Sequence, residues 1–193
     1  QDPAACLFPK DWLRFYDKEG EDFRAGFRFF GYCDPSLGKT AGSDFSAIIT
    51  LAQHRQSGLM YVLDADLERR HPDRIIQDVL EKARWLRREF GAQYTAFGAE
   101  TNQFQWFLKE RLAAESAAAG IYLPLVEVRA ASDKVLRIQS LQPDIRNGYL
   151  LFSRDQTELL RQLEQFPLGR HDDGPDALEG RYGCASRGRG WAP

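Results

Sequence analysis

The order of strand-like and helix-like segments constrains this sequence most. Three runs rich in aromatic and β-branched residues come first, at 27–33, 45–51 and 59–63, and such runs are typical of β-strands. Gly58 stands between the second and third runs and predicts a hairpin turn. Strand-like and helix-like patterns alternate after this point. We therefore expect an α/β fold in which a mixed sheet, antiparallel in its first three strands and then parallel, is covered by helices.

The later segments are bounded by residues that typically start or stop helices. Apolar residues at helical spacing predict an amphipathic helix over 72–91, with Pro72 in its first turn and Gly91 as its stop. A short strand from 94 is expected to end at Glu100. The remaining elements are predicted as a helix over 103–119, a strand within 121–128, a short helix over 134–141, a strand at 149–152, a helix over 155–166 and a last helix that begins near residue 171.

Length and composition favour one soluble domain. The 193 residues are 43% hydrophobic and 28% charged, which suits a single core. We expect a lead-in segment over 1–24 that packs on the outside, a domain over 25–182 and a flexible tail over 183–193. There is no leader pattern and no apolar run of membrane-spanning length, so we expect a cytoplasmic protein without membrane contact. The first residue is Gln1, which suggests a piece of a longer protein.

The cysteine count and the net charge argue against a disulfide framework, a zinc site and a general affinity for nucleic acid. The three cysteines, Cys6, Cys33 and Cys184, are far apart and form no C-x-x-C pair, which argues against a disulfide framework and against a zinc site. The net charge of −2 gives no global basic footprint for nucleic acid. DNA binding would therefore need a local basic patch.

The stretch GYCDPSLGKT, at 31–40, ends like a phosphate-binding loop but does not complete one. That loop requires the pattern G-x-x-x-x-G-K-[ST], and counting back five places from Gly38 gives Cys33 instead of glycine. Pro35 also lacks an N–H group where the loop needs donors. The sequence therefore disfavours a nucleotide site here, and Asp34 becomes the residue to explain.

Acidic residues stand at three places that the expected sheet would bring together. Asp34 ends the first predicted strand, Glu100 ends the fourth, and an acidic group at 172–176 opens the last helix. If the two strands are parallel neighbours, Asp34 and Glu100 emerge at the same carboxyl edge, where open α/β sheets have their sites. Asp173 and Asp176 are three residues apart and would share a helix face.

Two interpretations of these acids remain open from spacing alone. Carboxylate oxygens without histidine or cysteine partners favour Mg²⁺ or Mn²⁺, and two such ions would support hydrolysis of a phosphodiester. Alternatively, Asp173 and Asp176 only cap the helix or complement its dipole, Asp34 belongs to a strand-exit turn, and Glu100 is an ordinary acid at a helix start. His171 is interpreted as a local hydrogen-bonding residue rather than a metal ligand.

Four stretches together resemble the C-terminal nuclease domain of tailed-bacteriophage terminase large subunits, which has a ribonuclease H-like fold. The stretches are GYCDPSLGKTAGSDFSAIITL at 31–51, FGAE at 97–100, SDKVLRIQSLQP at 132–143 and HDDGPDALEG at 171–180. The resemblance extends from about residue 27 to 181 and rests on the order of all four. It implies a ribonuclease H-like mixed sheet flanked by helices.

The same resemblance implies an activity and a set of site residues. Members of this family cut concatemeric viral DNA during genome packaging with a metal-bound acidic cluster, which implies an endonuclease with Mg²⁺ or Mn²⁺, two ions in all. The implied catalytic metal ligands are Asp34, Glu100 and Asp173, with Asp176 as a further ligand, Asp44 and Asp172 as outer ligands, and Lys134 and Arg137 as contacts to DNA phosphates.

The resemblance also implies partners and a location. They are double-stranded DNA and, in a complete packaging motor, an ATPase domain, a small terminase subunit and the portal, in the cytoplasm of a bacterial host. The sequence has neither a complete phosphate loop nor room for the ATPase domain, which indicates an excised domain or a shortened prophage remnant. Two alternatives are kept: another ribonuclease H-like nuclease such as a resolvase, and a non-catalytic docking module of a packaging motor whose acids are structural.

Overall fold

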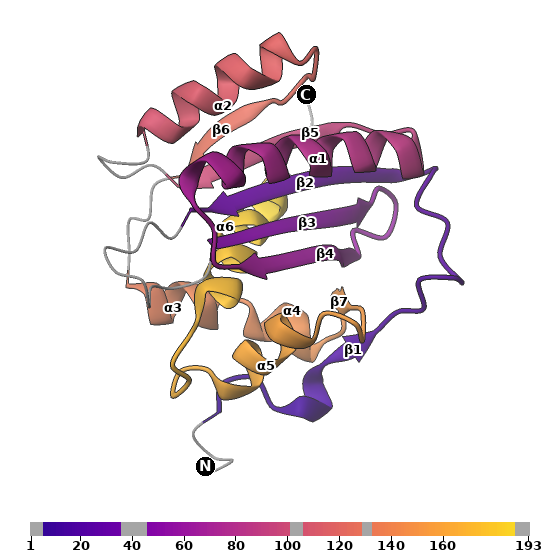
Figure 1. The fold of residues 1–193 in the computed structure, drawn as a ribbon. Coiled ribbons are helices and arrows are strands. Elements are labelled where there is room, and N and C mark those ends of the chain that lie inside the picture. Colours follow the sequence, from indigo (N-terminus) through magenta and orange to yellow (C-terminus); the bar gives the residue numbers. More distant parts are fainter. Residues whose placement is uncertain (1–5, 36–45, 101–105, 129–132, 188–193) are drawn as a thin grey trace.

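A computed structural model of the chain describes residues 6–35, 46–100, 106–128 and 133–187 (Figure 1). In these residues the strands form one seven-stranded sheet in the order β1-β7-β4-β3-β2-β5-β6. The strands are β1 (Arg14–Phe15), β2 (Phe27–Asp34), β3 (Ser46–His54), β4 (Met60–Glu68), β5 (Tyr94–Glu100), β6 (Leu125–Val128) and β7 (Leu150–Phe152). The helices are α1 (Pro72–Phe90), α2 (Trp106–Ala118), α3 (Lys134–Gln139), α4 (Gln142–Arg146), α5 (Thr157–Gln165) and α6 (Asp173–Arg187).

The predicted division of the sheet into an antiparallel and a parallel part is confirmed. β2, β3 and β4 pair antiparallel, whereas β5 pairs parallel with both β2 and β6. Gly58, in the hairpin between β3 and β4, has a φ of 74°, which glycine adopts without strain. β4 extends to Glu68, five residues beyond the predicted end, because its backbone stays paired with β3 although its side chains become charged. The fold class predicted from the sequence is therefore correct.

Helices cover both faces of the sheet, and each face has its own apolar core. On one face, α5 and α6 supply Leu159, Leu163 and Leu178, which pack against residues of β2 and β3 such as Tyr32 and Ile49. On the other face, α1 packs its buried stripe of Ile75, Ile76, Val79 and Leu80 against the sheet. In Figure 1, α1 runs along β2 at the upper side of these strands, and α6 lies behind β2, β3 and β4. Within the described ranges, none of the helices has the length and apolarity that crossing a membrane requires.

The lead-in segment, which was expected to pack on the outside, contributes some of its described side chains to the core. The side chain of Phe8 is completely buried and Leu13 is almost so, and both belong to the core beneath α5 and α6. β1 extends the sheet by pairing parallel with β7. A two-residue strand is too short to show the alternation that reveals a strand in a sequence.

The end of the chain also differs from the prediction. α6 continues to Arg187, although a flexible tail was expected from residue 183 onward. Arg181 and Tyr182 are buried on this helix, and their packing outweighs the low helix propensity of the neighbouring glycines. Gly180 is needed at its position, because a Cβ atom there would lie 2.7 Å from Cζ of Tyr32. Residues 188–193 lie outside the described residues.

Candidate functional site

The carboxyl ends of β2 and β5 meet at one edge of the sheet, as predicted. Asp34 is the last residue of β2, and its side chain is buried, with 8% exposed. Cys33 is paired with Ala99 across the parallel β2–β5 ladder, and Glu100 ends β5 one residue further on. The side chain of Glu100 lies outside the described set. The backbone therefore brings the first two predicted acids to neighbouring positions.

The first turn of α6 lies at the same edge. Asp34 of β2, Ala47 of β3 and Leu67 of β4 form one row across the sheet. Gly174 packs against this row so closely that a Cβ atom would lie 2.6 Å from Cδ2 of Leu67. Its N–H donates to Oε1 of Gln162 on α5 at 2.8 Å, which fixes the start of the helix. The sheet and α6 thus bring all three predicted acidic positions to one end of the molecule.

Asp173 and Asp176 are buried in this first turn, with 6% and 8% exposed. Buried carboxylates are costly unless cations or hydrogen-bond donors compensate them. Asp172, just before the helix, is more exposed. The backbone N–H of Asp176 donates to the carbonyl oxygen of Asp172 at 3.0 Å, so these acids are part of the helix start itself.

Two cations on α3 face the acids of α6. The ammonium nitrogen of Lys134 lies 2.8 Å from Oδ1 of Asp172 and 3.2 Å from Oδ2 of Asp176. Arg137 lies 2.8 Å from Oδ1 of Asp176 and 2.7 Å from Oε2 of Glu179. The two basic residues are three apart on a short helix and therefore share a face. The negative charge of Asp172, Asp176 and Glu179 is thus partly offset by this chain's own side chains.

Burial and the neighbouring carboxylates shift the pKa values of Lys134 and Arg137 in opposite directions. Burial alone would lower the pKa of Lys134, but the carboxylates of Asp172 and Asp176 outweigh it and hold the pKa above its ordinary value. Burial would likewise lower the pKa of the Arg137 guanidinium, but Asp176 and Glu179 outweigh it and raise this pKa above its ordinary value. Both side chains therefore remain charged at neutral pH.

α3 presents these cations because of its local sequence. The carboxylate of Asp133 accepts a hydrogen bond from the N–H of Leu136 at 3.1 Å and caps the helix. Ile138 is buried and anchors the helix to the core, while Leu136 is exposed. Lys134 and Arg137 are left on the side that faces α6. The sequence predicted both as contacts to DNA phosphates, and the structure shows them paired with carboxylates.

We call the acids at this end of the sheet the acidic edge: Asp34, Glu100, Asp172, Asp173 and Asp176. Carboxylate oxygens fit a hard divalent cation by chemistry. Among the side chains that the structure describes, however, no group of three His, Cys, Asp or Glu residues is arranged to hold a metal ion. Asp172 and Asp176 are turned toward α3. Glu100, which the sequence assigns to the cluster, has no described side chain, and Asp44 lies outside the described residues.

Sequence analysis did not find Glu179 or the role of Arg181. Glu179 follows Asp176 by one helical turn and completes the bridge to Arg137, so the i, i+3 spacing of the two acids was the available signal. Arg181 is almost fully buried on α6, and its guanidinium lies 4.4 Å from the ring centre of Phe30. Nδ1 of His171 lies 4.0 Å from Oδ2 of Asp173, which is longer than a hydrogen bond.

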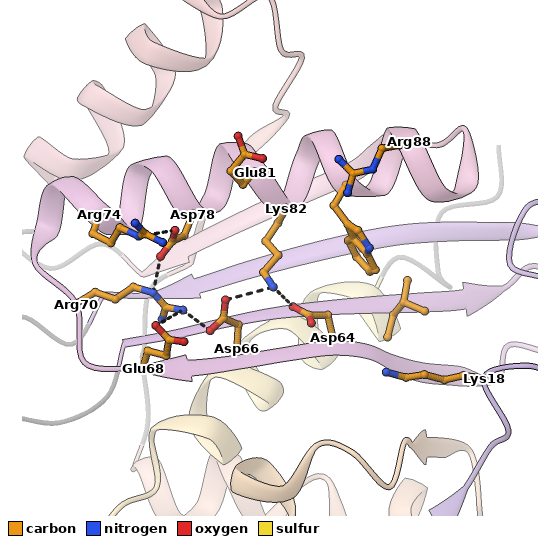
Figure 2. Close-up of a pocket in the computed structure, with 12 residues that line it drawn as sticks. Lys18, Asp64, Asp66, Glu68, Arg70, Arg74, Asp78, Glu81, Lys82 and Arg88 are labelled. Atoms are coloured by element: carbon orange, nitrogen blue, oxygen red, sulfur yellow. Dashed lines mark hydrogen bonds and ion pairs between the residues drawn. The ribbon is translucent and has the colours of Figure 1, made fainter.

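A second group of charges lines a pocket of about 550 Å³ between α1 and β4 (Figure 2). Lys82 reaches Asp64 at 2.7 Å and Asp66 at 3.2 Å. Arg70 bonds to Asp66 and Asp78, and it donates to the carbonyl oxygen of Ser46 at 3.1 Å. This group lies on the α1 side of the sheet, and no motif in the sequence singles it out.

Comparison with solved structures identifies the fold. The nuclease domain of the human cytomegalovirus terminase, soaked with Mn and bound to an inhibitor, aligns with a TM-score of 0.67 at 14% identity, over 92% of this chain and 90% of that one. The P22 large terminase nuclease domain gives a TM-score of 0.65 at 13% identity, over 94% and 92%. The chain has the fold of terminase nuclease domains.

Two further comparisons agree with this fold. The large terminase nuclease domain of Thermus phage P74-26 aligns with a TM-score of 0.56 at 21% identity, over 89% of this chain and 90% of that one. The large terminase of a thermophilic bacteriophage aligns with a TM-score of 0.62 at 10% identity, over 91% of this chain but only 42% of that longer one. No protein-family model and no curated protein matches the sequence.

Proposed function

We propose that this chain is the metal-dependent DNA endonuclease domain of a phage or prophage packaging terminase and cuts concatemeric DNA. One observation carries the proposal. In a fold shared with terminase nuclease domains, the end of β2, the end of β5 and the first turn of α6 bring their acids to one sheet edge. The carboxyl edge is where α/β sheets place their sites.

Asp34, Glu100 and Asp173 are the proposed catalytic ligands of Mg²⁺ or Mn²⁺, with Asp176 as a further ligand and Asp44 and Asp172 as outer ligands. Two bound ions would activate a water and stabilise the leaving oxygen of the phosphodiester. The burial of Asp34, Asp173 and Asp176 supports this assignment, since buried carboxylates bind a cation with little competition from water. A human cytomegalovirus terminase nuclease domain of the same fold has been soaked with Mn, which supports a divalent ion.

Double-stranded DNA is the proposed substrate, and Lys134 and Arg137 are its proposed phosphate contacts. Both lie beside the acidic edge, so a phosphate held there would place the scissile bond near the acids. In a complete motor the proposed partners are an ATPase domain, a small terminase subunit and the portal, in a bacterial cytoplasm. The alignment with less than half of a large terminase supports a place within a longer protein.

A second candidate is the docking module, in which the acids are structural. The observation that favours it is the pairing of Asp172, Asp176 and Glu179 with Lys134 and Arg137, because two cations of the chain offset much of the charge of these three acids without any metal. A resolvase-type nuclease would share the fold but would require branched DNA.

Cleavage of supercoiled plasmid with Mn²⁺, Mg²⁺ or EDTA separates these candidates. The variants are Asp34→Asn and Asp173→Asn, and Asp64→Asn is a matched control from the other face of the sheet. Metal-dependent cutting by the protein and by the control, but not by the two edge variants, would support the endonuclease. A folded protein that neither cuts plasmid nor binds Mn²⁺ would favour the docking module. Cutting restricted to four-way junctions would indicate a resolvase.

A further inference from the structure

Lys134 and Arg137 hold Asp176 in different ways. Lys134 reaches Asp176 with a compact ammonium on a flexible stem, and 40% of its side chain is exposed. Arg137 bridges Asp176 and Glu179 with two guanidinium nitrogens, and only 17% of its side chain is exposed. Moving Arg137 would leave Glu179 without its cation and Asp176 with Lys134 alone, whereas Lys134 can turn into solvent. Lys134 is therefore the cation that can leave at the lower cost.

We propose that Lys134 is an exchangeable counter-ion of the acidic edge. It neutralises Asp172 and Asp176 while no metal is bound, and it moves to a DNA phosphate when a divalent ion takes these carboxylates. Arg137 stays on Asp176 and Glu179 and keeps them in position. This inference rests on the proposed function, because it concerns the metal and the DNA assigned there.

Such an exchange couples the two binding events. An ion that binds Asp172 and Asp176 frees Lys134 for a phosphate, and a phosphate that binds Lys134 frees the carboxylates for an ion. Each ligand therefore strengthens the binding of the other by the same factor. The acidic edge would load its metal most tightly when DNA is present.

Lys82 is an internal control for this proposal. Like Lys134, it bridges two aspartates, at 2.7 Å and 3.2 Å (Figure 2). These partners, Asp64 and Asp66, lie on β4 facing α1, and they are not among the proposed metal ligands. The two lysines therefore share their chemistry and differ in their location.

Lysine acylation followed by mass spectrometry tests the exchange directly. With EDTA, the ion pairs should keep the labelling of Lys134 and Lys82 low. With saturating Mn²⁺, we expect the labelling of Lys134 to rise several-fold and that of Lys82 to stay constant. Adding a short DNA duplex to the Mn²⁺-bound protein should protect Lys134 again. Unchanged labelling of Lys134 in protein that has bound Mn²⁺ would overturn the proposal.

Mn²⁺ titration by calorimetry, without DNA, gives an independent readout. Removing a competing positive charge next to the carboxylates should tighten Mn²⁺ binding by Lys134→Met about tenfold. Lys82→Met should bind Mn²⁺ as the unaltered protein does. Equal or weaker binding by Lys134→Met would contradict a competing lysine. If the unaltered protein binds no Mn²⁺ at all, the proposed nuclease function is contradicted. If it binds Mn²⁺ but Lys134→Met does not bind it more tightly, only the proposed exchange is contradicted.

Discussion

Two networks of aspartates and basic residues lie on opposite faces of the same sheet. On the α1 face, Asp64 and Asp66 project from the body of β4 to Lys82, and Arg70 ties the end of β4 to α1. On the α6 face, Asp172 and Asp176 pair with Lys134 beside the end of β2. Both networks are built from ion pairs, so ion pairing alone does not distinguish them. The two networks differ in position, because the α6-face network lies at the carboxyl ends of parallel strands, where ligand sites form.

The largest effect on stability is expected from Arg70→Met in the α1 network. Only 2% of the Arg70 side chain is exposed, and its loss leaves Asp66 and Asp78 without their shared cation. We expect the free energy of unfolding in urea to fall by about 3–5 kcal/mol, as when one partner of a buried ion pair is removed. Arg161→Met removes an exposed pair with Glu158 and should cost less than about 1 kcal/mol. Equal losses would mean that Arg70 is not a structural clamp.

A smaller effect is expected where α6 packs against β2. In Gly180→Ala the added methyl group would clash with Tyr32, and overpacking of this kind costs about 1–3 kcal/mol. A shift of α6 away from β2 would also separate Asp173 from Asp34, so Mn²⁺ binding should weaken. The measurements are urea unfolding and calorimetric Mn²⁺ titration.

Gly91→Ala is the matched control for that variant. Gly91 ends α1 with a φ of 63° and has no neighbour within 4 Å of an added Cβ. Alanine should cost about 1 kcal/mol through backbone strain alone and should leave Mn²⁺ affinity unchanged. Weaker Mn²⁺ binding in both variants would mean that the metal responds to overall stability rather than to the packing of α6.

The smallest stability effect is expected from the two bridging lysines. Lys82→Met and Lys134→Met each remove ion pairs of a partly exposed side chain, and each should lower the free energy of unfolding by about 1 kcal/mol or less. Thermal unfolding of both variants provides the measurement. A much larger loss in Lys134→Met would indicate that this lysine is a fixed part of the structure, against the proposed exchange.

The neighbourhood of the candidate acids was predictable from the sequence, but their ion pairs were not. Asp34 and Glu100 follow strand patterns long enough to recognise, and parallel strands must end at one edge, so their neighbourhood followed from the element order. Glu179 was missed, because its bridge to Arg137 depends on how α3 packs against α6. The short β1 was missed for a related reason, since its pairing partner β7 is far away in the sequence. Tertiary contacts, rather than local patterns, decide these features.

Anomalous diffraction from Mn²⁺-soaked crystals tests the central claim most directly, because it locates the ion without relying on activity. We predict a manganese peak at the acidic edge, in contact with Asp34 and Asp173, and no peak between Asp64 and Asp66. A manganese peak only in the α1 network would contradict the assignment of the acidic edge as the metal site. The absence of any manganese peak would also contradict it, provided that crystal packing leaves the acidic edge open to solvent.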